Sequence, residues 1–154
     1  MKIIYIMGKD GSGKQTVYDI LSKDTVIPFT QLDPEYDLLE MEPDTFESNG
    51  IYLVIGRLSK YLLLKNKFGD DLLPIYLYVD DQTRLIRNIY GYPDQLFDIC
   101  KTFVADTYDY SEVKLTAAKL TRHVMFNNNG SISGTIHKIR SFILRNTKKE
   151  RERS

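Results

Sequence analysis

A glycine-rich turn near the N-terminus constrains the fold of this chain more than any other feature. The turn reads Gly8-Lys9-Asp10-Gly11-Ser12-Gly13-Lys14-Gln15-Thr16 and follows the apolar run Lys2-Ile3-Ile4-Tyr5-Ile6-Met7. The residues after it predict a helix over about 14–21. A strand, a turn with GxxxxGK spacing and a helix, in this order, are typical of a phosphate-binding loop. The alternative, a glycine-rich turn that precedes a helix by chance, is disfavoured because all three parts are in sequence.

Each part of this turn has a physical role in holding phosphate. Glycines let the backbone fold closely around a polyphosphate, the N–H groups point inward, and the helix N-terminus adds a partial positive charge. The ammonium group of Lys14 is expected against the β- and γ-phosphates. The position after the lysine, normally Ser or Thr, is Gln15, and the hydroxyl group follows at Thr16. We expect nine residues to contact a nucleotide here: Gly8, Lys9, Asp10, Gly11, Ser12, Gly13, Lys14, Gln15 and Thr16.

Length and composition predict one globular domain over 1–154, because 154 residues with 42% hydrophobic content suffice for one core. No run approaches the roughly 20 apolar residues of a membrane span, and the N-terminus lacks the layout of a signal peptide, so a cytoplasmic location without a membrane partner is expected. The balance of 21 basic and 21 acidic residues gives no signal for nucleic acid. Cys100 is the only cysteine and is interpreted as a core residue.

Residues 31–50 differ from the rest of the chain in charge. They contain seven acidic residues, two prolines and no Lys or Arg. Such a segment repels phosphate unless a metal ion intervenes. Two interpretations remain open, a solvated acidic connector and a metal-bridged wall of a substrate site.

Apolar runs and helical patterns alternate along the chain. Strands are expected at 25–30, 51–55, 72–79 and 123–126, and the run 51–55 should lie beside the first strand. Helices are expected from Leu58 to about Phe68, from a cap at Asp80 or Asp81 to Gly91, from Leu96 to about Val104, and after a cap at Ser131 or Ser133. This alternation predicts an α/β fold, a parallel sheet with helices on both faces and ligands at the carboxyl ends of the strands. Residues 146–154 are expected to form a basic, frayed tail without the aromatic platform of a nucleic-acid site.

Several of these stretches together resemble the guanylate kinases and related nucleoside monophosphate kinases. In that family the lysine of the loop is commonly followed by a small residue and then Thr, as Thr16 follows Gln15 here. Further landmarks in matching order are Tyr52-Leu53-Val54-Ile55-Gly56, Pro74-Ile75-Tyr76-Leu77-Tyr78-Val79-Asp80-Asp81, Arg84-Leu85 with Arg87, Phe103-Val104-Ala105-Asp106 and Phe126-Asn127. The resemblance covers all but the acidic segment and implies a three-layer αβα fold of the P-loop nucleoside kinase type.

The resemblance implies transfer of the γ-phosphoryl group of ATP to a nucleoside monophosphate, GMP or dGMP, with Mg²⁺. Lys14 would be a catalytic cation, Thr16 would face the metal ion, and Asn127 would border the adenine. Arg84 and Arg87 begin the region that carries lid arginines in the family, with Arg84 preferred, and Lys101 falls where another arginine is usual. For both arginines the alternative is an exposed helical charge. The partners would be small-molecule nucleotides, and the oligomeric state is left open.

The acceptor half departs from the family pattern. The lobe that grips the monophosphate has shrunk to residues 31–50, and the arginine that usually follows Thr30 is absent. The strand 51–55 lacks the carboxylate that usually closes it, and the lid between Tyr90 and Leu96 is short. Two functions are therefore carried forward: a minimal guanylate kinase-like enzyme, and a guanylate kinase-like module that binds ATP or GTP with weak or no catalysis.

Overall fold

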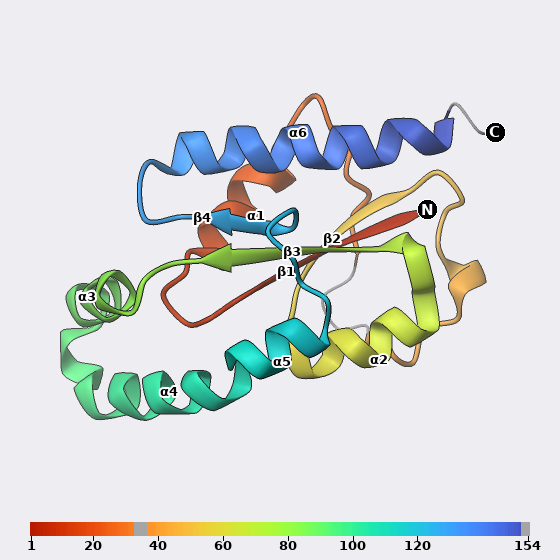
Figure 1. The fold of residues 1–154 in the computed structure, drawn as a ribbon. Coiled ribbons are helices and arrows are strands. Elements are labelled where there is room, and N and C mark those ends of the chain that lie inside the picture. Colours follow the sequence, from red (N-terminus) through yellow and green to blue (C-terminus); the bar gives the residue numbers. More distant parts are fainter. Residues whose placement is uncertain (33–36, 152–154) are drawn as a thin grey trace.

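The computed structural model describes residues 1–32 and 37–151, and in these residues the core is a four-stranded sheet. The strands are β1 (Lys2–Gly8), β2 (Ile51–Ile55), β3 (Leu72–Tyr78) and β4 (Met125–Asn127), in the order β2-β1-β3-β4 with every pair parallel. The predicted neighbour of the first strand is confirmed, since Ile4 of β1 lies opposite Leu53 of β2. β1 is therefore a central strand, and the glycine-rich turn leaves from the middle of the sheet (Figure 1).

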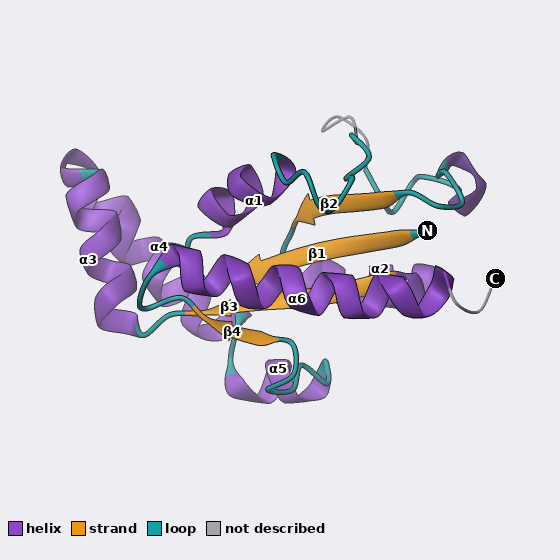
Figure 2. Cartoon of the chain, turned by 90° about the horizontal axis from the view of Figure 1, so that it is seen from above, coloured by secondary structure: helices purple, strands orange, loops and turns teal. Residues whose placement is uncertain are grey.

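Helices cover both faces of this sheet and confirm the α/β fold in three layers. α1 (Lys14–Ser22) and α6 (Ile132–Arg151) lie on one face, and α2 (Leu58–Phe68) and the short α5 (Glu112–Ala117) lie on the other (Figure 1). α3 (Asp81–Gly91) and α4 (Leu96–Asp109) lie beyond the carboxyl ends of the strands (Figure 2). Of the two candidate caps of α3, Asp80 is the one used, and its carboxylate accepts the N–H of Thr83 at 2.8 Å. The described residues also form 3₁₀ turns at Pro43–Thr45, Gly69–Asp71 and Pro93–Gln95.

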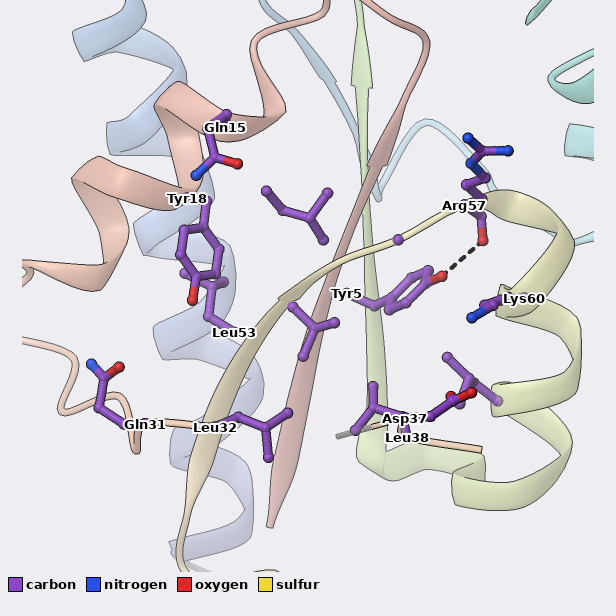
Figure 3. Close-up of a pocket in the computed structure, with 14 residues that line it drawn as sticks. Tyr5, Gln15, Tyr18, Gln31, Leu32, Asp37, Leu38, Leu53, Arg57 and Lys60 are labelled. Atoms are coloured by element: carbon purple, nitrogen blue, oxygen red, sulfur yellow. Dashed lines mark hydrogen bonds between the residues drawn. The ribbon is translucent and has the colours of Figure 1, made fainter. Parts of the chain in front are cut away.

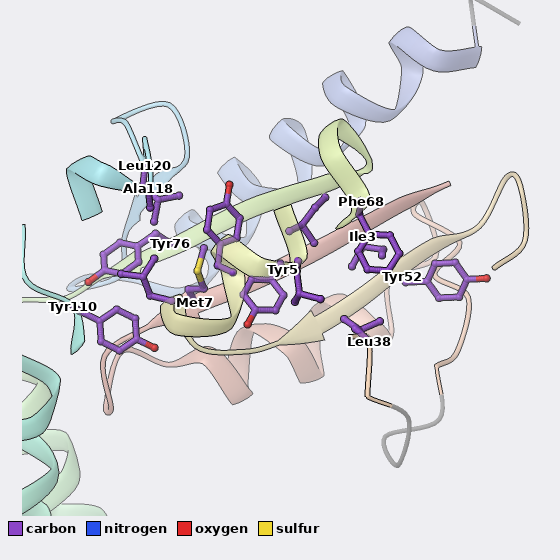
Figure 4. Packing of buried hydrophobic residues seen from close by; sticks show 14 of the residues in the cluster. Ile3, Tyr5, Met7, Leu38, Tyr52, Phe68, Tyr76, Tyr110, Ala118 and Leu120 are labelled. Carbon is purple, nitrogen blue, oxygen red and sulfur yellow. The ribbon is translucent and has the colours of Figure 1, made fainter. Parts of the chain in front are cut away.

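The residues of β1 alternate between two hydrophobic cores, because successive side chains of a strand point to opposite faces. Ile3, Tyr5 and Met7 pack with α2 and with aromatic side chains from the connector and β3 (Figure 4). Ile4 and Ile6 pack with α1 and α6 on the other face. All seven residues of β1 are buried, as a strand covered on both faces requires.

The prediction of a strand at 25–30 is wrong. The carboxylate of Asp24 accepts the N–H groups of Val26 (2.7 Å) and Ile27 (3.1 Å), and this holds the chain in a bend. Pro28 then removes a donor that a sheet ladder would need. Only Thr30 bonds to the neighbouring strand, by donating its N–H to the carbonyl of Ile51 at 2.7 Å.

In the described part of the connector, 31–32 and 37–50, the acidic side chains are exposed as a solvated connector requires, but two apolar side chains of the segment are not. Leu38 and Phe46 are buried in the core on the α2 side. Phe46 makes edge contacts with the rings of Tyr52 and Phe68, with centroids 5.0 and 5.7 Å away. The acidic side chains therefore surround two apolar anchors. Residues 33–36, where part of the metal-bridged wall was expected, lie outside the described residues.

The interpretation of Cys100 as a core residue is also wrong, because its side chain is exposed. α4 extends past the end of the sheet, beside α3 (Figure 2). It buries Ile99 and Asp106, while Phe97 is 81% exposed. Much of the apolar stripe that the helical spacing predicts for α4 is therefore exposed.

The backbone near the C-terminus is helical where the sequence predicts a frayed tail. α6 continues through Arg151, so the expected frayed tail is helical over 146–151. Within residues 1–32 and 37–151, no helix has both the length and the apolar character needed to cross a bilayer.

Asp24, which follows α1, forms an ion pair with Arg140 of α6. We base a prediction of stability on this pair. The side chain of Asp24 is 1% exposed. Burial alone would raise the pKa of Asp24, but the donors from Val26, Ile27 and Arg140 outweigh it and hold the pKa below its ordinary value of 3.8. The charged carboxylate therefore contributes stability above the ordinary pKa, and this contribution is lost as the pH falls through the lowered pKa.

We expect Asp24→Asn to reduce the free energy of unfolding by about 1–2 kcal/mol at pH 7, since Arg140 is partly exposed and its pairing is screened. Urea denaturation at pH 7 and below pH 3 measures this, and the difference between variant and parent should shrink at the lower pH. Asp19→Asn, on the exposed side of α1, is the control. Equal losses at both pH values would contradict the role of the charge.

Candidate functional site

The glycine-rich turn closes into a tight loop between β1 and α1. The N–H of Ser12 donates to the carbonyl of Lys9 at 3.1 Å, and that of Val17 donates to the carbonyl of Gly13 at 3.0 Å. Gly11 and Gly13 have φ values of +79° and +92°, a conformation that residues with a Cβ rarely adopt. A Cβ on Gly13 would also lie 2.6 Å from the Nδ2 of Asn128. The loop conformation thus depends on these two glycines.

Three consecutive carbonyl groups of the loop are held from outside by side chains of distant elements. The pairs are Asp10 with Nη1 of Arg84 (3.1 Å), Gly11 with Nη1 of Arg87 (3.3 Å) and Ser12 with Nδ2 of Asn128 (2.9 Å). The N–H of Asp10 donates to the carboxylate of Asp106 on α4 at 2.8 Å. α3, α4 and the segment after β4 therefore fix the orientation of the peptide groups.

Several N–H groups of the loop have no hydrogen-bond acceptor in the described part of the chain. They include those of Gly11, Gly13, Lys14, Gln15 and Thr16. The last three are at the N-terminus of α1, where the helix dipole favours negative charge. Successive unpaired N–H groups beside a helix N-terminus form a site for an anion.

The ammonium group of Lys14 folds back onto the start of the loop. Its Nζ donates to the carbonyls of Gly8 (2.5 Å) and Lys9 (3.4 Å), and it forms no ion pair with a described residue. Burial lowers the pKa of Lys14, the carboxylates of Asp10 and Asp106 oppose that shift, and the guanidinium of Arg57 adds to it. The ammonium group is therefore partly desolvated and bonded only to carbonyls, which a phosphate oxygen can replace.

Arg84, the preferred lid arginine, is placed beneath the loop. Its side chain is 1% exposed, lies 2.9 Å from the carboxylate of Asp81 and 3.6 Å from that of Asp106, and stacks on the ring of Phe103. The alternative interpretation as an exposed helical charge is wrong for this residue. Arg87 is half-buried and bonds to the loop and to the carbonyl of Asn128 at 2.7 Å. In this conformation both arginines support the loop from behind.

An open cleft of about 1000 Å³ lies in front of the loop. One wall consists of Gly8, Asp10 and Lys14, and the end of β2 forms another. α4 supplies the third wall, and its polar lining residues are Asp98, Lys101, Thr102, Asp106 and Asp109. Lys101, the weaker of the predicted cations, therefore faces the same space as Lys14.

A second cavity of about 800 Å³ lies between α1 and α2. Gln15 and Tyr18 line it from α1, and Arg57 and Lys60 line it from the start of α2 (Figure 3). The connector contributes residues 31–32 and 37–38. The two cavities share Ile55, Gly56 and Arg57, so they meet at the carboxyl end of β2.

The residues expected to bind the adenine and the metal are at the surface. The side chain of Asn127 is exposed and accepts the N–H of Asn129 at 2.9 Å. Thr16 is exposed on the first turn of α1. Among the residues that the structure describes, no group of three or more His, Cys, Asp or Glu side chains could hold a metal ion.

Sequence reasoning missed three residues of this site. Asn128 and Asp106 hold the loop from parts of the chain about 100 residues away from it, and no local pattern could indicate those contacts. Arg57 has a local signal, because it follows the last residues of a predicted buried strand, where ligands of parallel sheets bind.

Gly13→Ala is expected to damage this site in two ways. It forces a Cβ into the left-handed region and against Asn128, which should cost about 1–2 kcal/mol of folding stability. It should also weaken ATP binding at least tenfold, because the loop must shift. Urea denaturation and calorimetric ATP titration measure both effects. Gly130→Ala is the matched control, since its Cβ would have no neighbour within 4 Å. Equal behaviour of the two variants would contradict the role of the loop geometry.

Comparison of the chain with protein-family models and with curated proteins finds no match.

Proposed function

We propose that this protein is a guanylate kinase-like nucleotide kinase, which transfers the γ-phosphoryl group of ATP to a nucleoside monophosphate. The observation that carries the proposal is the continuity of the site. A loop that carries Lys14 and several N–H groups without a partner among the described residues opens into a cleft that leads directly to a second, nucleoside-sized cavity. Two phosphorylated ligands can thus approach one another at the end of β2.

The donor half has the chemistry needed for a triphosphate. Its N–H groups and the ammonium of Lys14 supply partial and full positive charge without a competing ion pair from a described residue. The Mg²⁺ that accompanies ATP would neutralise further charge, and we assign the hydroxyl of Thr16 as its side-chain ligand, as the resemblance implies. Phosphoryl transfer requires little covalent help from protein, so positioning and electrostatic stabilisation account for most of the catalysis.

The acceptor half has the size and the polarity for a nucleoside. A volume of about 800 Å³ is within the range of small-molecule sites. Apolar side chains such as Leu32 and Leu53 can contact a base, and the amides of Gln15 and Gln31 can read its edge. Asp37 is the only carboxylate among the described lining residues. Guanine presents two adjacent N–H groups, which one carboxylate can accept together, and this supports GMP or dGMP as the acceptor.

A second function, an ATP- or GTP-binding module with weak catalysis, is favoured by the charge of the α4 wall. On the α4 wall, three carboxylates, those of Asp98, Asp106 and Asp109, line the cleft beside one cation, Lys101, and Arg84 is buried behind the loop. Carboxylates near a transferring phosphoryl group would raise the barrier through like-charge repulsion.

A coupled assay of ADP release with ATP, Mg²⁺ and a panel of ribo- and deoxynucleoside monophosphates tests the proposal. We expect turnover with at least one acceptor and the highest kcat/KM with GMP or dGMP. Binding of ATP without turnover on any acceptor would support the binding module instead. Failure to bind ATP or GTP in calorimetry would reject both functions.

A further inference from the structure

We propose that Arg57 holds the phosphate group of the acceptor and thereby joins the two cavities into one substrate site. This inference rests on the proposed kinase function and names a specificity-determining residue for it.

The backbone of Arg57 is fixed by a buried tyrosine. The hydroxyl of Tyr5, a residue that is 1% exposed, donates to the carbonyl of Arg57 at 2.8 Å (Figure 3). The N–H of Gly56 donates to the carbonyl of Ile6 at 3.0 Å, which extends the pairing of β2 with β1 by one residue. A Cβ on Gly56 would lie 1.9 Å from the hydroxyl oxygen of Tyr5, so glycine is required there. Arg57 therefore begins α2 from a rigid point at the end of β2.

The side chain of Arg57 is in contrast unengaged. It is exposed, and its guanidinium group has no hydrogen bond or ion pair with any residue in 1–32 or 37–151. Arg57 is also the only charged residue among the described residues that line both cavities. A free guanidinium at the junction of two cavities is suited to an anion that must reach from one into the other.

The charges around this junction favour an anion. The guanidinium of Arg57 lowers the pKa of Lys14, so the two cations act on one another across the first cleft. A phosphate group between them would turn this repulsion into two attractions. Guanidinium also binds phosphate oxygens in a bidentate manner, which fixes orientation as well as position.

Lys60 adds a second positive charge on the same side of the second cavity. Lys60 is in the first turn of α2, and Arg57 is the residue immediately before that helix, so the two cations line the same cavity from neighbouring positions. A monophosphate held by Arg57 would then have its nucleoside in the cavity beside Lys60 and Tyr18, and its phosphate oxygens toward Lys14.

Kinetics of Arg57→Ala and Arg57→Lys test this assignment. We expect Arg57→Ala to raise the KM of the monophosphate at least tenfold while the KM of ATP changes less than twofold, and we expect Arg57→Lys to recover part of the loss. Arg122→Ala is the matched control, because Arg122 is exposed and lines neither cavity. An unchanged KM of the monophosphate in Arg57→Ala would overturn the inference and leave the kinase function intact.

A binding experiment separates this inference from the kinase proposal. Equilibrium dialysis without ATP compares GMP, AMP, CMP and UMP with the matching nucleosides. We expect the parent protein to bind at least one monophosphate more tightly than its nucleoside, and Arg57→Ala to lose this difference. That result without turnover would support the inference and reject the kinase. Equal binding of every monophosphate and its nucleoside by the parent protein would overturn the inference.

Discussion

Replacement of Lys14 by alanine is expected to lower kcat for phosphoryl transfer by a factor of about 10²–10³. The loss corresponds to about 3–4 kcal/mol of transition-state stabilisation, the size found when one preorganised donor is removed from a water-excluded site. The reason is the position of the ammonium group, which lies at the loop, is partly desolvated and contacts only two carbonyl oxygens. Its charge is therefore available to the phosphoryl group during transfer.

The coupled ADP-release assay measures this effect, with ATP binding measured separately by calorimetry. Lys23→Ala at the other end of α1 is the control, because that lysine is exposed and far from the loop along the helix. Parent-like kcat in Lys14→Ala, with the fold intact by circular dichroism, would remove the loop from the catalytic machinery and with it the kinase proposal.

Replacement of Arg84 is expected to have the largest effect on stability. Arg84→Met keeps apolar contact with the ring of Phe103 but leaves Asp106 and the carbonyl of Asp10 without their cationic partner. Removal of one member of a buried charged network typically costs about 3–5 kcal/mol. We therefore expect a loss of this size in the free energy of unfolding, together with weaker ATP binding.

This variant distinguishes two roles of Arg84. A lid arginine that contacts the phosphoryl group would lower kcat and leave the unfolding free energy near that of the parent. A residue that supports the loop would lower both stability and ATP affinity. Urea denaturation of Arg84→Met, Asp106→Asn and the double variant measures the coupling, which should fall between about 0.5 and 3 kcal/mol. Arg122→Ala is the exposed control. Additive losses would contradict a shared network.

Several strands, turns and helix caps could be predicted because each is specified by residues that are adjacent in the sequence. The continuous apolar run of β1 reports burial on both faces, and the glycines of the loop report a backbone that needs positive φ. Asp80 is a short acceptor immediately before a helical pattern, and it caps α3. In each case the residues that carry the signal also form the structure.

The errors arose where a residue's environment depends on distant partners. The periodicity of α4 indicates a buried stripe, but at the end of the sheet Cys100 of this helix is exposed. The acidic composition of residues 37–50 indicates solvent, although Leu38 and Phe46 reach the core. Arg84 carries the same charge as any surface arginine, and only its contacts with Asp10, Asp106 and Phe103 make it internal.

Local patterns in the sequence were enough to predict the parallel α/β architecture and the tight glycine-rich loop after the first strand, because hydrophobic period and glycine conformation act over a few residues. Only the three-dimensional structure shows which side chains hold the loop, where the two cavities meet and that the guanidinium of Arg57 has no partner among the described residues at their junction. The physical reason is that a charge in a long sequence can be paired, buried or free, and this depends on which distant groups the packing of the helices brings beside it.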